Sequence, residues 1–214
     1  MRPMFKLAYR PEISGFQHIP GDGAAIIASN HLSEVDSLVL PMVAPRPISF
    51  LAKAEYFTAP GLKGWASRSF FTGVGAVPVE RGNGRAALAA LDTAERILGR
   101  GELFGIYPEG TRSPDGRLHR GRVGVARLAL RTGAPVVPVG ILGTDIVQPV
   151  GKKVPGLGRV TVRFGAPLDF SKYRGLERNR TVQRAVVDEI MRAILELSQQ
   201  EYVDVYGSTV KSAA

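Results

Sequence analysis

The 214-residue chain has no cysteine, and this absence excludes disulfide bonds, thiol nucleophiles and thiolate metal sites. It has only three histidines, whose scattered positions do not suggest a zinc site. It has no long apolar run, so we expect no membrane-spanning helix, and its N-terminus lacks the pattern of a signal peptide. Its length suits one domain with a sizeable core.

Negative charge is scarce relative to positive charge, since 28 Lys and Arg residues oppose 19 Asp and Glu residues and give a formal net charge of +9. A basic surface suits nucleic acid, anionic lipid or a phosphorylated substrate. The chain has neither the aromatic-rich sheet motif of an RNA-recognition module nor a recognition-helix motif. We therefore expect no nucleic acid partner. An anionic membrane and a phosphorylated substrate are favoured over a generic basic surface.

Short apolar runs alternate with segments of helical periodicity, which predicts an α/β fold. The last strand alternates polar and apolar residues, so we expect it near a sheet edge. Residues 11–206 are expected to form the domain, and 207–214 a frayed tail. The predicted strands cover 11–14, 24–28, 47–52, 74–79, 103–107, 135–141 and 158–164. The predicted helices cover 34–44, 60–70, 85–98, 121–132 and 180–202.

A first polar cluster, residues 30–36, directly follows a short apolar run and begins with Asn30. Open α/β folds place reactive groups where a buried strand ends. Imidazole exchanges a proton near neutral pH, and a carboxylate on its other ring nitrogen fixes the tautomer. The cluster therefore indicates His31 as a general base that Asp36 orients. The alternative is a helix capping box, with Ser33 as the N-cap and Asp36 three residues later.

The two interpretations are compatible under one geometric condition. On a regular helix, side chains five residues apart point about 140° away from each other. His31 and Asp36 can therefore pair only if His31 lies before the helix and folds back over its first turn.

A second polar cluster, residues 107–113, also follows a short apolar run and contains Glu109, Gly110, Thr111 and Arg112. In both clusters a predicted strand leads into a charged loop. The combination of Asn-His-x-Ser-x-x-Asp with Tyr-Pro-Glu-Gly-Thr-Arg-Ser resembles the glycerolipid acyltransferase family, specifically the 1-acylglycerol-3-phosphate acyltransferases.

The other two sequence blocks of that family also have counterparts. Residues 75–81 resemble the block that ends in a phosphate-binding arginine, here Arg81, and residues 136–140 resemble the fourth, apolar block. All four blocks occur in the family's order within roughly residues 10–170. The resemblance implies a single domain with a mixed, mostly parallel sheet flanked by helices. One departure is Glu34, where relatives often carry an aromatic or small residue, and it concerns the choice of acceptor.

The resemblance also implies a reaction. An acyl chain would move from a thioester, either acyl-CoA or acyl carrier protein, to the free hydroxyl of lysophosphatidic acid, with no metal or other cofactor. His31 would take the proton of the attacking hydroxyl, a role worth about 10²–10⁴-fold, while Asp36 holds the tautomer. Ser33 suits a helix cap better than a nucleophile, because the acceptor hydroxyl attacks directly.

Arginine suits the acceptor phosphate because its guanidinium can donate two hydrogen bonds to one phosphate. Arg81 and Arg112 are the candidates, and a surface ion pair is the alternative for each. Gly110 would allow the backbone to approach the substrate closely, and backbone N–H groups near Gly110 are the candidate donors to the oxyanion. Glu109 is expected to hold an arginine or to accept from a glycerol hydroxyl. The remaining expected substrate-binding residues are Asn30, Ser33 and Thr111.

A basic stretch follows the second cluster. Arg120 and Arg122 are either contacts for the phosphates of an acyl carrier or part of a solvated basic face. His119 lies among these arginines, whose charge disfavours its protonation. His18 is expected to be a surface residue.

Two segments are candidates for reversible membrane contact. Residues 1–10 mix apolar and cationic residues, with Met4, Phe5 and Leu7 as the apolar part. Residues 61–71 combine Trp65, Phe70 and Phe71 with two cations, which suits the headgroup region, although a core helix with inward-facing aromatics is the alternative. These features favour a peripheral enzyme on the cytoplasmic face of the cell membrane.

Two other functions compete with this hypothesis. The acceptor could be glycerol 3-phosphate, another lysophospholipid, an ornithine lipid or a glycolipid. The chain could also be a lipid- or nucleic-acid-binding module that carries the motifs without catalysis.

Overall fold

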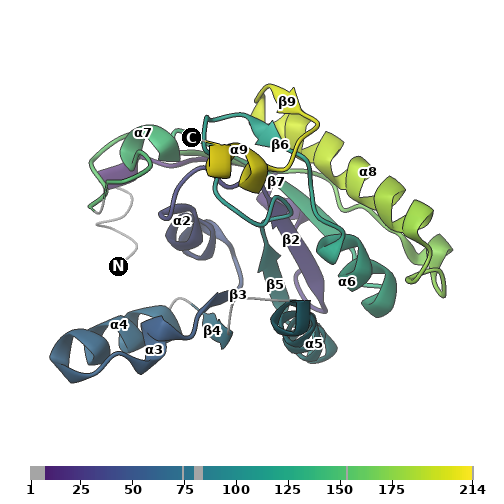
Figure 1. The fold of residues 1–214 in the computed structure, drawn as a ribbon, viewed down its shortest axis with the longest axis horizontal. Helices are drawn as coiled ribbons and strands as arrows, with labels where there is room; N and C mark the ends of the chain where they lie inside the picture. The colour runs from purple at the N-terminus through teal and green to yellow at the C-terminus, as the bar shows by residue number, and fades with distance from the viewer. Residues whose placement is uncertain (1–7, 74, 80–83, 153, 214) are drawn as a thin grey trace.

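A seven-stranded, mostly parallel sheet forms the centre of the molecule, with strand order β1-β8-β7-β2-β5-β3-β4 (Figure 1). The structure is a computed structural model and describes residues 8–73, 75–79, 84–152 and 154–213. Every neighbouring pair is parallel except β7 and β8. The strands are β1 (Glu12–Ser14), β2 (Ala25–Ser29), β3 (Ile48–Lys53), β4 (Ala76–Val79), β5 (Leu103–Ile106), β7 (Val136–Leu142) and β8 (Thr161–Phe164).

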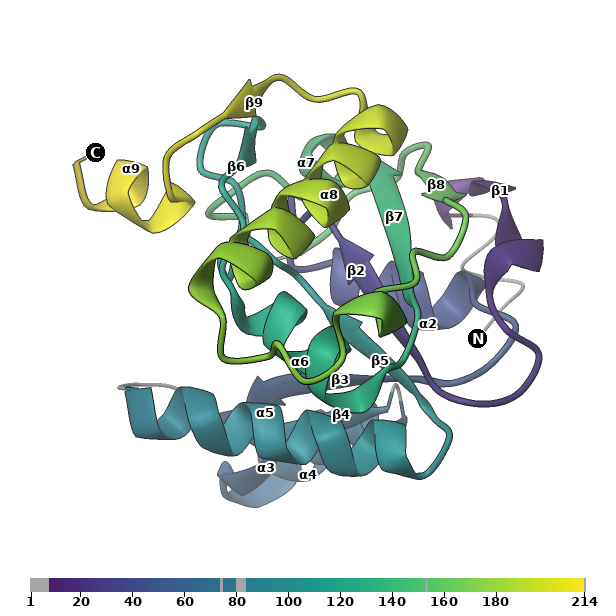
Figure 2. The same ribbon diagram turned by 90° about the vertical axis from the view of Figure 1, so that its right-hand side faces the viewer.

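Helices cover both faces of this sheet because successive strand residues point to opposite sides. In β2, Ile26 and Ala28 pack with α5, α6 and α8, whereas Ala25 and Ile27 pack with α2. Figure 2 shows α6 and α8 in front of the sheet and α2 behind it. The strands are therefore apolar on both faces, as expected for a covered parallel sheet. The helices are α2 (Asp36–Val43), α3 (Glu55–Thr58), α4 (Gly61–Gly73), α5 (Gly84–Gly99), α6 (Gly124–Thr132), α7 (Thr144–Val147), α8 (Arg180–Ser198) and α9 (Gly207–Ala213).

The register of the central strands determines where the two polar clusters lie. Ala28 of β2 is level with Ile106 of β5 and with Pro138 of β7. Because these strands are parallel, the loops that follow β2 and β5 leave the same edge of the sheet. Residues 30–36 and 107–113 are therefore neighbours, as the rule for open α/β sheets predicts.

The C-terminal region differs from its sequence-based prediction. Helix α8 ends at Ser198 rather than at 202, because Gln199 adopts a left-handed conformation with φ of 57°. The chain then adds β9 (Tyr202–Val203) to β6 (Leu118–His119) in a second, two-stranded sheet. The tail that was expected to fray forms α9, because Gly207 packs against the second polar cluster.

The α3–α4 hairpin stands apart from the helices that cover the sheet (Figure 1). A Cβ atom at Gly64 would lie 1.8 Å from the carbonyl oxygen of Ala59, so the two short helices pack closely only because residue 64 is glycine. Trp65 is 64% exposed, which contradicts the alternative of an inward-facing tryptophan. The side chains of Phe70 and Phe71 and all of residues 1–7 lie outside the described residues.

Candidate active site

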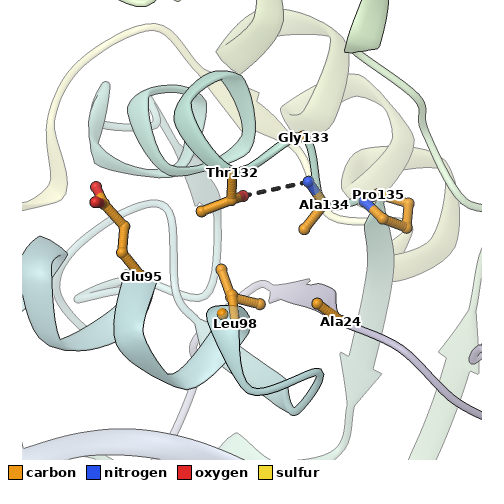
Figure 3. A pocket seen from close by; sticks show the side chains of 8 residues that line it. Ala24, Glu95, Leu98, Thr132, Gly133, Ala134 and Pro135 are labelled. Carbon is orange, nitrogen blue, oxygen red and sulfur yellow. Dashed lines mark hydrogen bonds between the residues drawn. The ribbon is translucent and has the colours of Figure 1, made fainter.

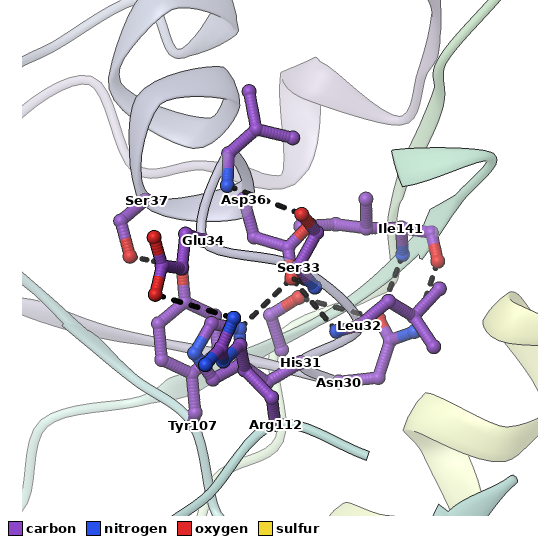
Figure 4. Close-up of polar contacts among 12 residues, drawn as sticks. Asn30, His31, Leu32, Ser33, Glu34, Asp36, Ser37, Tyr107, Arg112 and Ile141 are labelled. Atoms are coloured by element: carbon purple, nitrogen blue, oxygen red, sulfur yellow. Dashed lines mark hydrogen bonds and ion pairs between the residues drawn. The ribbon is translucent and has the colours of Figure 1, made fainter. Parts of the chain in front are cut away.

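The carboxylate of Asp36, the first residue of α2, organises the loop that precedes it. Its Oδ2 accepts hydrogen bonds from His31 Nδ1 and from the backbone N–H groups of Leu32 and Ser33, all at 2.8 Å (Figure 4). Asp36 is fully buried, whereas the His31 side chain keeps 15% of its surface exposed. His31 therefore lies before the helix and folds back over its first turn, which is the geometry that pairing requires.

The hydrogen bonds identify the tautomer of His31. A carboxylate can only accept, so the proton of the neutral imidazole lies on Nδ1 and Nε2 presents a lone pair. Asp36 also performs half of the capping interaction, because it accepts from the Ser33 N–H. The helix nevertheless begins at Asp36, with Val35 as its N-cap residue, instead of starting at Ser33.

Asn30 and Ser33 were expected at the substrate, but both are buried and hydrogen-bonded within the protein. The Asn30 side chain donates to the Ile141 carbonyl at 2.9 Å and accepts from the Ile141 N–H at 2.8 Å, which ties the end of β2 to β7. The Ser33 hydroxyl donates to the Gln148 carbonyl at 2.9 Å, beyond α7. The side chains of Asn30 and Ser33 therefore hold the loop in shape, because they are hydrogen-bonded to the backbone of Ile141 and Gln148.

Glu109 connects its own loop to the His31 loop and to strand β6, and within the described residues it does not hold an arginine. It is 1% exposed, and its two carboxylate oxygens accept the backbone N–H groups of His31 at 3.3 Å and of His119 at 2.9 Å. Burial raises the pKa of Glu109 to about 7, although these two hydrogen bonds oppose the shift. The carboxylate is therefore a structural link between the first polar cluster and the strand β6.

Gly110 is required by two independent constraints. Its φ of 73° is left-handed, and a Cβ atom there would lie 2.8 Å from Cδ and Nε of Arg122. Its own N–H donates to the Tyr107 carbonyl at 3.0 Å within the turn, so this one N–H is not free for an oxyanion, and the other N–H groups near Gly110 stay the expected donors. The neighbouring Thr111 is partly exposed, and its methyl group is 3.3 Å from the Cβ position of Gly207.

Arg112 lies beside His31 and Glu34 (Figure 4). Its Nη1 is 3.2 Å from Oε1 of Glu34, and both side chains retain solvent exposure, 29% and 59% respectively. The surface ion pair that was the alternative for Arg112 is therefore present in this structure. The guanidinium is still accessible to a phosphate. Arg81, the other candidate, lies outside the described residues.

Three groups near this site were not assigned a role from the sequence. The Tyr107 ring stacks on His31, with 3.8 Å between ring centroids and 10° between planes. His119 is fully buried and its Nε2 is 2.9 Å from Oδ1 of Asp115. The position of Tyr107 at the start of the second polar cluster, two residues before Glu109, could have singled it out, and the four-residue spacing of Asp115 and His119 could have suggested their contact.

Arg120 and Arg122 of the basic stretch are in contact with the C-terminal segment and are not simply solvated. The guanidinium groups of Arg120 and Arg122 lie 5.6 and 5.2 Å from the centroid of the Tyr206 ring, and Arg122 donates to the Ser208 hydroxyl at 2.8 Å. The segment that leads into α9 therefore engages both arginines. His18, expected at the surface, is partly buried, and its Nδ1 is 2.9 Å from the carbonyl oxygen of Phe164.

A pocket lies at the opposite end of the sheet, where β2 and β7 begin (Figure 3). Glu95 is the only ionisable residue that lines it, and one oxygen of Glu95 pairs with Arg131 at 2.8 Å. The two polar side chains that line it, Glu95 and Thr132, are already engaged by Arg131 and by the backbone of Leu128 and Ala134, so the chemistry is expected at the other end, beside His31. The lining residues are Ala24, Glu95, Leu98, Gly99, Thr132, Gly133, Ala134 and Pro135.

Residues 10–142 match the family model described as Acyltransferase, a span that includes both polar clusters and Arg81. The chain belongs to the acyltransferase family. Among relatives, the 1-acyl-sn-glycerol-3-phosphate acyltransferase of Bacillus subtilis is 31% identical over 86% of this chain and 87% of its own length. The chloroplastic 1-acyl-sn-glycerol-3-phosphate acyltransferase LPAT1 of Arabidopsis thaliana is 32% identical over 77% of this chain. This acyltransferase chain spans only 45% of LPAT1.

The fold is shared with a solved acyltransferase. The crystal structure of the 1-acyl-sn-glycerophosphate (LPA) acyltransferase PlsC from Thermotoga maritima is similar, with a TM-score of 0.67 and 30% sequence identity. The similarity covers 91% of this chain and 74% of that chain, so the expected mixed, mostly parallel sheet of the acyltransferase is confirmed. Within the described ranges, no helix is long and apolar enough to cross a membrane.

Proposed function

We propose that the protein transfers an acyl chain from an acyl thioester to the free hydroxyl of 1-acylglycerol 3-phosphate, with His31 as the general base. The observation that carries this proposal is the His31–Asp36 pair. It engages Nδ1 and leaves Nε2, with its lone pair available to accept a proton, on a partly exposed ring. The names of the relatives and of the similar solved structure support the choice of acceptor.

The reaction needs one proton carrier and no protein nucleophile. The acceptor hydroxyl donates its proton to Nε2 while its oxygen attacks the thioester carbonyl. The tetrahedral intermediate then collapses, the C–S bond breaks, and the imidazolium returns the proton to the departing sulfur. Asp36 stabilises the imidazolium between these two steps and keeps Nδ1 protonated throughout. Arg112, with Arg81, would bind the phosphate of the acceptor.

The decisive experiment measures release of free thiol from acyl-CoA or from acyl carrier protein with lysophosphatidic acid as acceptor. We expect release that depends on both substrates and that His31→Ala abolishes. A parallel panel would contain glycerol 3-phosphate, other lysophospholipids, an ornithine lipid acceptor and a glycolipid acceptor. Thiol release with one of these and none with lysophosphatidic acid would overturn the choice of acceptor. If no acceptor supports thiol release, the alternative of a non-catalytic lipid-binding module is favoured.

The proposed acceptor and product are lipids, so we also propose reversible attachment to anionic membranes at the cytoplasmic face through the α3–α4 hairpin. The support is the exposed Trp65 on a hairpin that stands apart from the body, together with the net charge of +9. Trp65→Ser should reduce co-sedimentation with anionic vesicles, whereas Leu88→Ser, at a residue 52% exposed on α5, should not. If Trp65→Ser sediments with vesicles as well as Leu88→Ser and wild type do, the α3–α4 hairpin is not the attachment site, and residues 1–10 become the candidate.

A further inference from the structure

We propose that Tyr107 and Phe50 are positioning residues, which form an aromatic column that holds the His31 imidazole at the angle its proton transfer requires. Tyr107 stacks on His31 at 3.8 Å, and Phe50 lies 5.6 Å from Tyr107 with 23° between the ring planes. The three rings come from three adjacent places on the sheet: the loop after β2, the end of β5, and β3.

The column rests on a glycine. Phe50 is level with Gly105 in the β3–β5 register. A Cβ atom at Gly105 would lie only 2.2 Å from Cε1 and Cζ of Phe50, so any side chain there would displace that ring. The absence of a side chain at residue 105 therefore lets Phe50 lie across β5 and reach Tyr107.

Tyr107 also connects the column to the helix that carries the carboxylate. Its hydroxyl is 3.1 Å from the hydroxyl of Ser37, which directly follows Asp36 in α2 (Figure 4). One side chain thus contacts the imidazole with its ring and the first turn of α2 with its hydroxyl. Burial, with a smaller contribution from Asp36, raises the pKa of Tyr107 well above its usual range, so the hydroxyl keeps its proton.

The two contacts on His31 restrict different motions. The Nδ1 hydrogen bond fixes one atom of the ring but allows the plane to tilt about the Nδ1–Asp36 line. The stack restrains the tilt of the plane, and because the lone pair of Nε2 lies in that plane, the tilt sets the direction along which the acceptor hydroxyl must approach. A displacement of about 1 Å in such an arrangement can cost roughly 100-fold in rate.

The first test is spectroscopic and does not require activity. Protons of a ring that stacks on an aromatic face resonate upfield, and His31 can be assigned because the chain has only three histidines and His31→Ala removes one set of signals. We expect Tyr107→Leu to shift the His31 ring protons downfield and Tyr107→Phe to leave them upfield. Unchanged signals in Tyr107→Leu would overturn the stack.

The second test rests on the proposed function and separates positioning from binding. Tyr107→Leu should lower kcat by about 10- to 100-fold, with the KM of both substrates within about twofold. Tyr107→Phe, which loses one hydroxyl contact, should stay within about fivefold of wild type. Gly105→Ala should lower kcat as well, because it displaces Phe50. Wild-type kcat in Tyr107→Leu, or equal loss in Tyr107→Phe, would overturn the positioning role.

A matched control excludes a general effect of removing a tyrosine. Tyr173→Leu changes a partly buried tyrosine that packs against the hydrophobic core on the α5, α6 and α8 face of the sheet, whereas Tyr107 packs against the core on the α2 face. It should alter neither the His31 signals nor kcat, and thermal unfolding of all variants would verify that they are folded. If the wild-type protein transfers no acyl chain, the proposed function fails, while the spectroscopic test still decides whether the column exists.

Discussion

Two histidine–aspartate pairs lie side by side in this molecule, and only one of them suits catalysis. His31 pairs with Asp36 at 2.8 Å, and His119 pairs with Asp115 at 2.9 Å. The backbone N–H groups of both histidines donate to the same carboxylate, that of Glu109. The pairs differ in which partner reaches solvent, because His31 is partly exposed above a buried aspartate, whereas His119 is buried behind an aspartate that is 27% exposed.

The difference arises from what covers each histidine. His31 lies in a loop at the open edge of the main sheet, so its second ring nitrogen can meet a substrate. His119 belongs to β6 and is covered by α9, since a Cβ atom at Gly207 would lie 3.4 Å from its Cγ. Within the described residues, its buried Nδ1 has no hydrogen-bond partner. Accessibility of the second ring nitrogen, and not the aspartate contact alone, therefore distinguishes His31, the proposed general base, from His119.

Replacing each histidine by alanine should separate the two pairs most strongly. We expect His31→Ala to reduce turnover by about 10²–10⁴-fold and to change the free energy of unfolding by only about 1 kcal/mol. His119→Ala should lower the free energy of unfolding by about 2–3 kcal/mol, because it empties a buried position, but leave turnover of the folded protein nearly intact. Steady-state kinetics and chemical denaturation measure both effects. Loss of turnover in folded His119→Ala would show that both histidine–aspartate pairs are needed for catalysis and would contradict the comparison.

The aspartates should show the same contrast at a smaller magnitude. Asp36→Asn removes the charge that stabilises the imidazolium, so turnover should fall by about 100-fold or more. Burial opposes ionisation of Asp115, but hydrogen bonds from Arg117 and His119 outweigh it and hold the pKa of that carboxyl well below its usual range. Asp115→Asn should therefore cost stability at neutral pH without loss of turnover. Equal kinetic effects of the two substitutions would contradict the comparison.

Glu109, which links the two pairs, should give a pH-dependent contribution to stability. Its folded-state pKa of about 7 exceeds the ordinary value of 4.5, so the folded protein retains this proton between about pH 4.5 and 7 while the unfolded chain releases it. The contribution to stability is therefore present at low pH and is lost as pH rises to 7, a change of about 3 kcal/mol.

Urea denaturation of wild type and Glu109→Gln at several pH values tests this slope. We expect the wild-type free energy of unfolding to fall more steeply than that of the variant between pH 5 and 7. The variant should also be less stable at pH 8, where Glu109 is ionised and accepts both backbone N–H groups, because the amide of Gln offers one acceptor oxygen and leaves one of these N–H groups without its partner. Parallel slopes would show that Glu109 does not titrate in this range.

The sequence predicted the pair His31–Asp36 but not the pair His119–Asp115, although the two residues of each pair are close in the sequence. His31 and Asp36 are five residues apart after an apolar run, and the seven strands of the main sheet lie within three residues of their predicted bounds. By contrast, β6 and β9 are two residues each and have no periodicity to detect. Glu109 was recognised as functional, but its two donors are 78 and 10 residues away, so its linking role required the tertiary structure.

The smallest expected effect concerns the ion pair of Glu34 and Arg112, which lies beside the His31–Asp36 pair. The Glu34 carboxylate contacts Nη1 of Arg112, the guanidinium proposed to bind the acceptor phosphate, so we expect it to compete with the phosphate for this guanidinium. An exposed ion pair is worth at most about 1 kcal/mol, so Glu34→Gln should lower the KM of lysophosphatidic acid by about two- to fivefold without changing that of the thioester, and less so at high salt. Glu12→Gln is the matched control, because it breaks an exposed ion pair with Arg159 at the far edge of the sheet. A higher KM in Glu34→Gln would instead mean that Glu34 holds Arg112 in place for the phosphate.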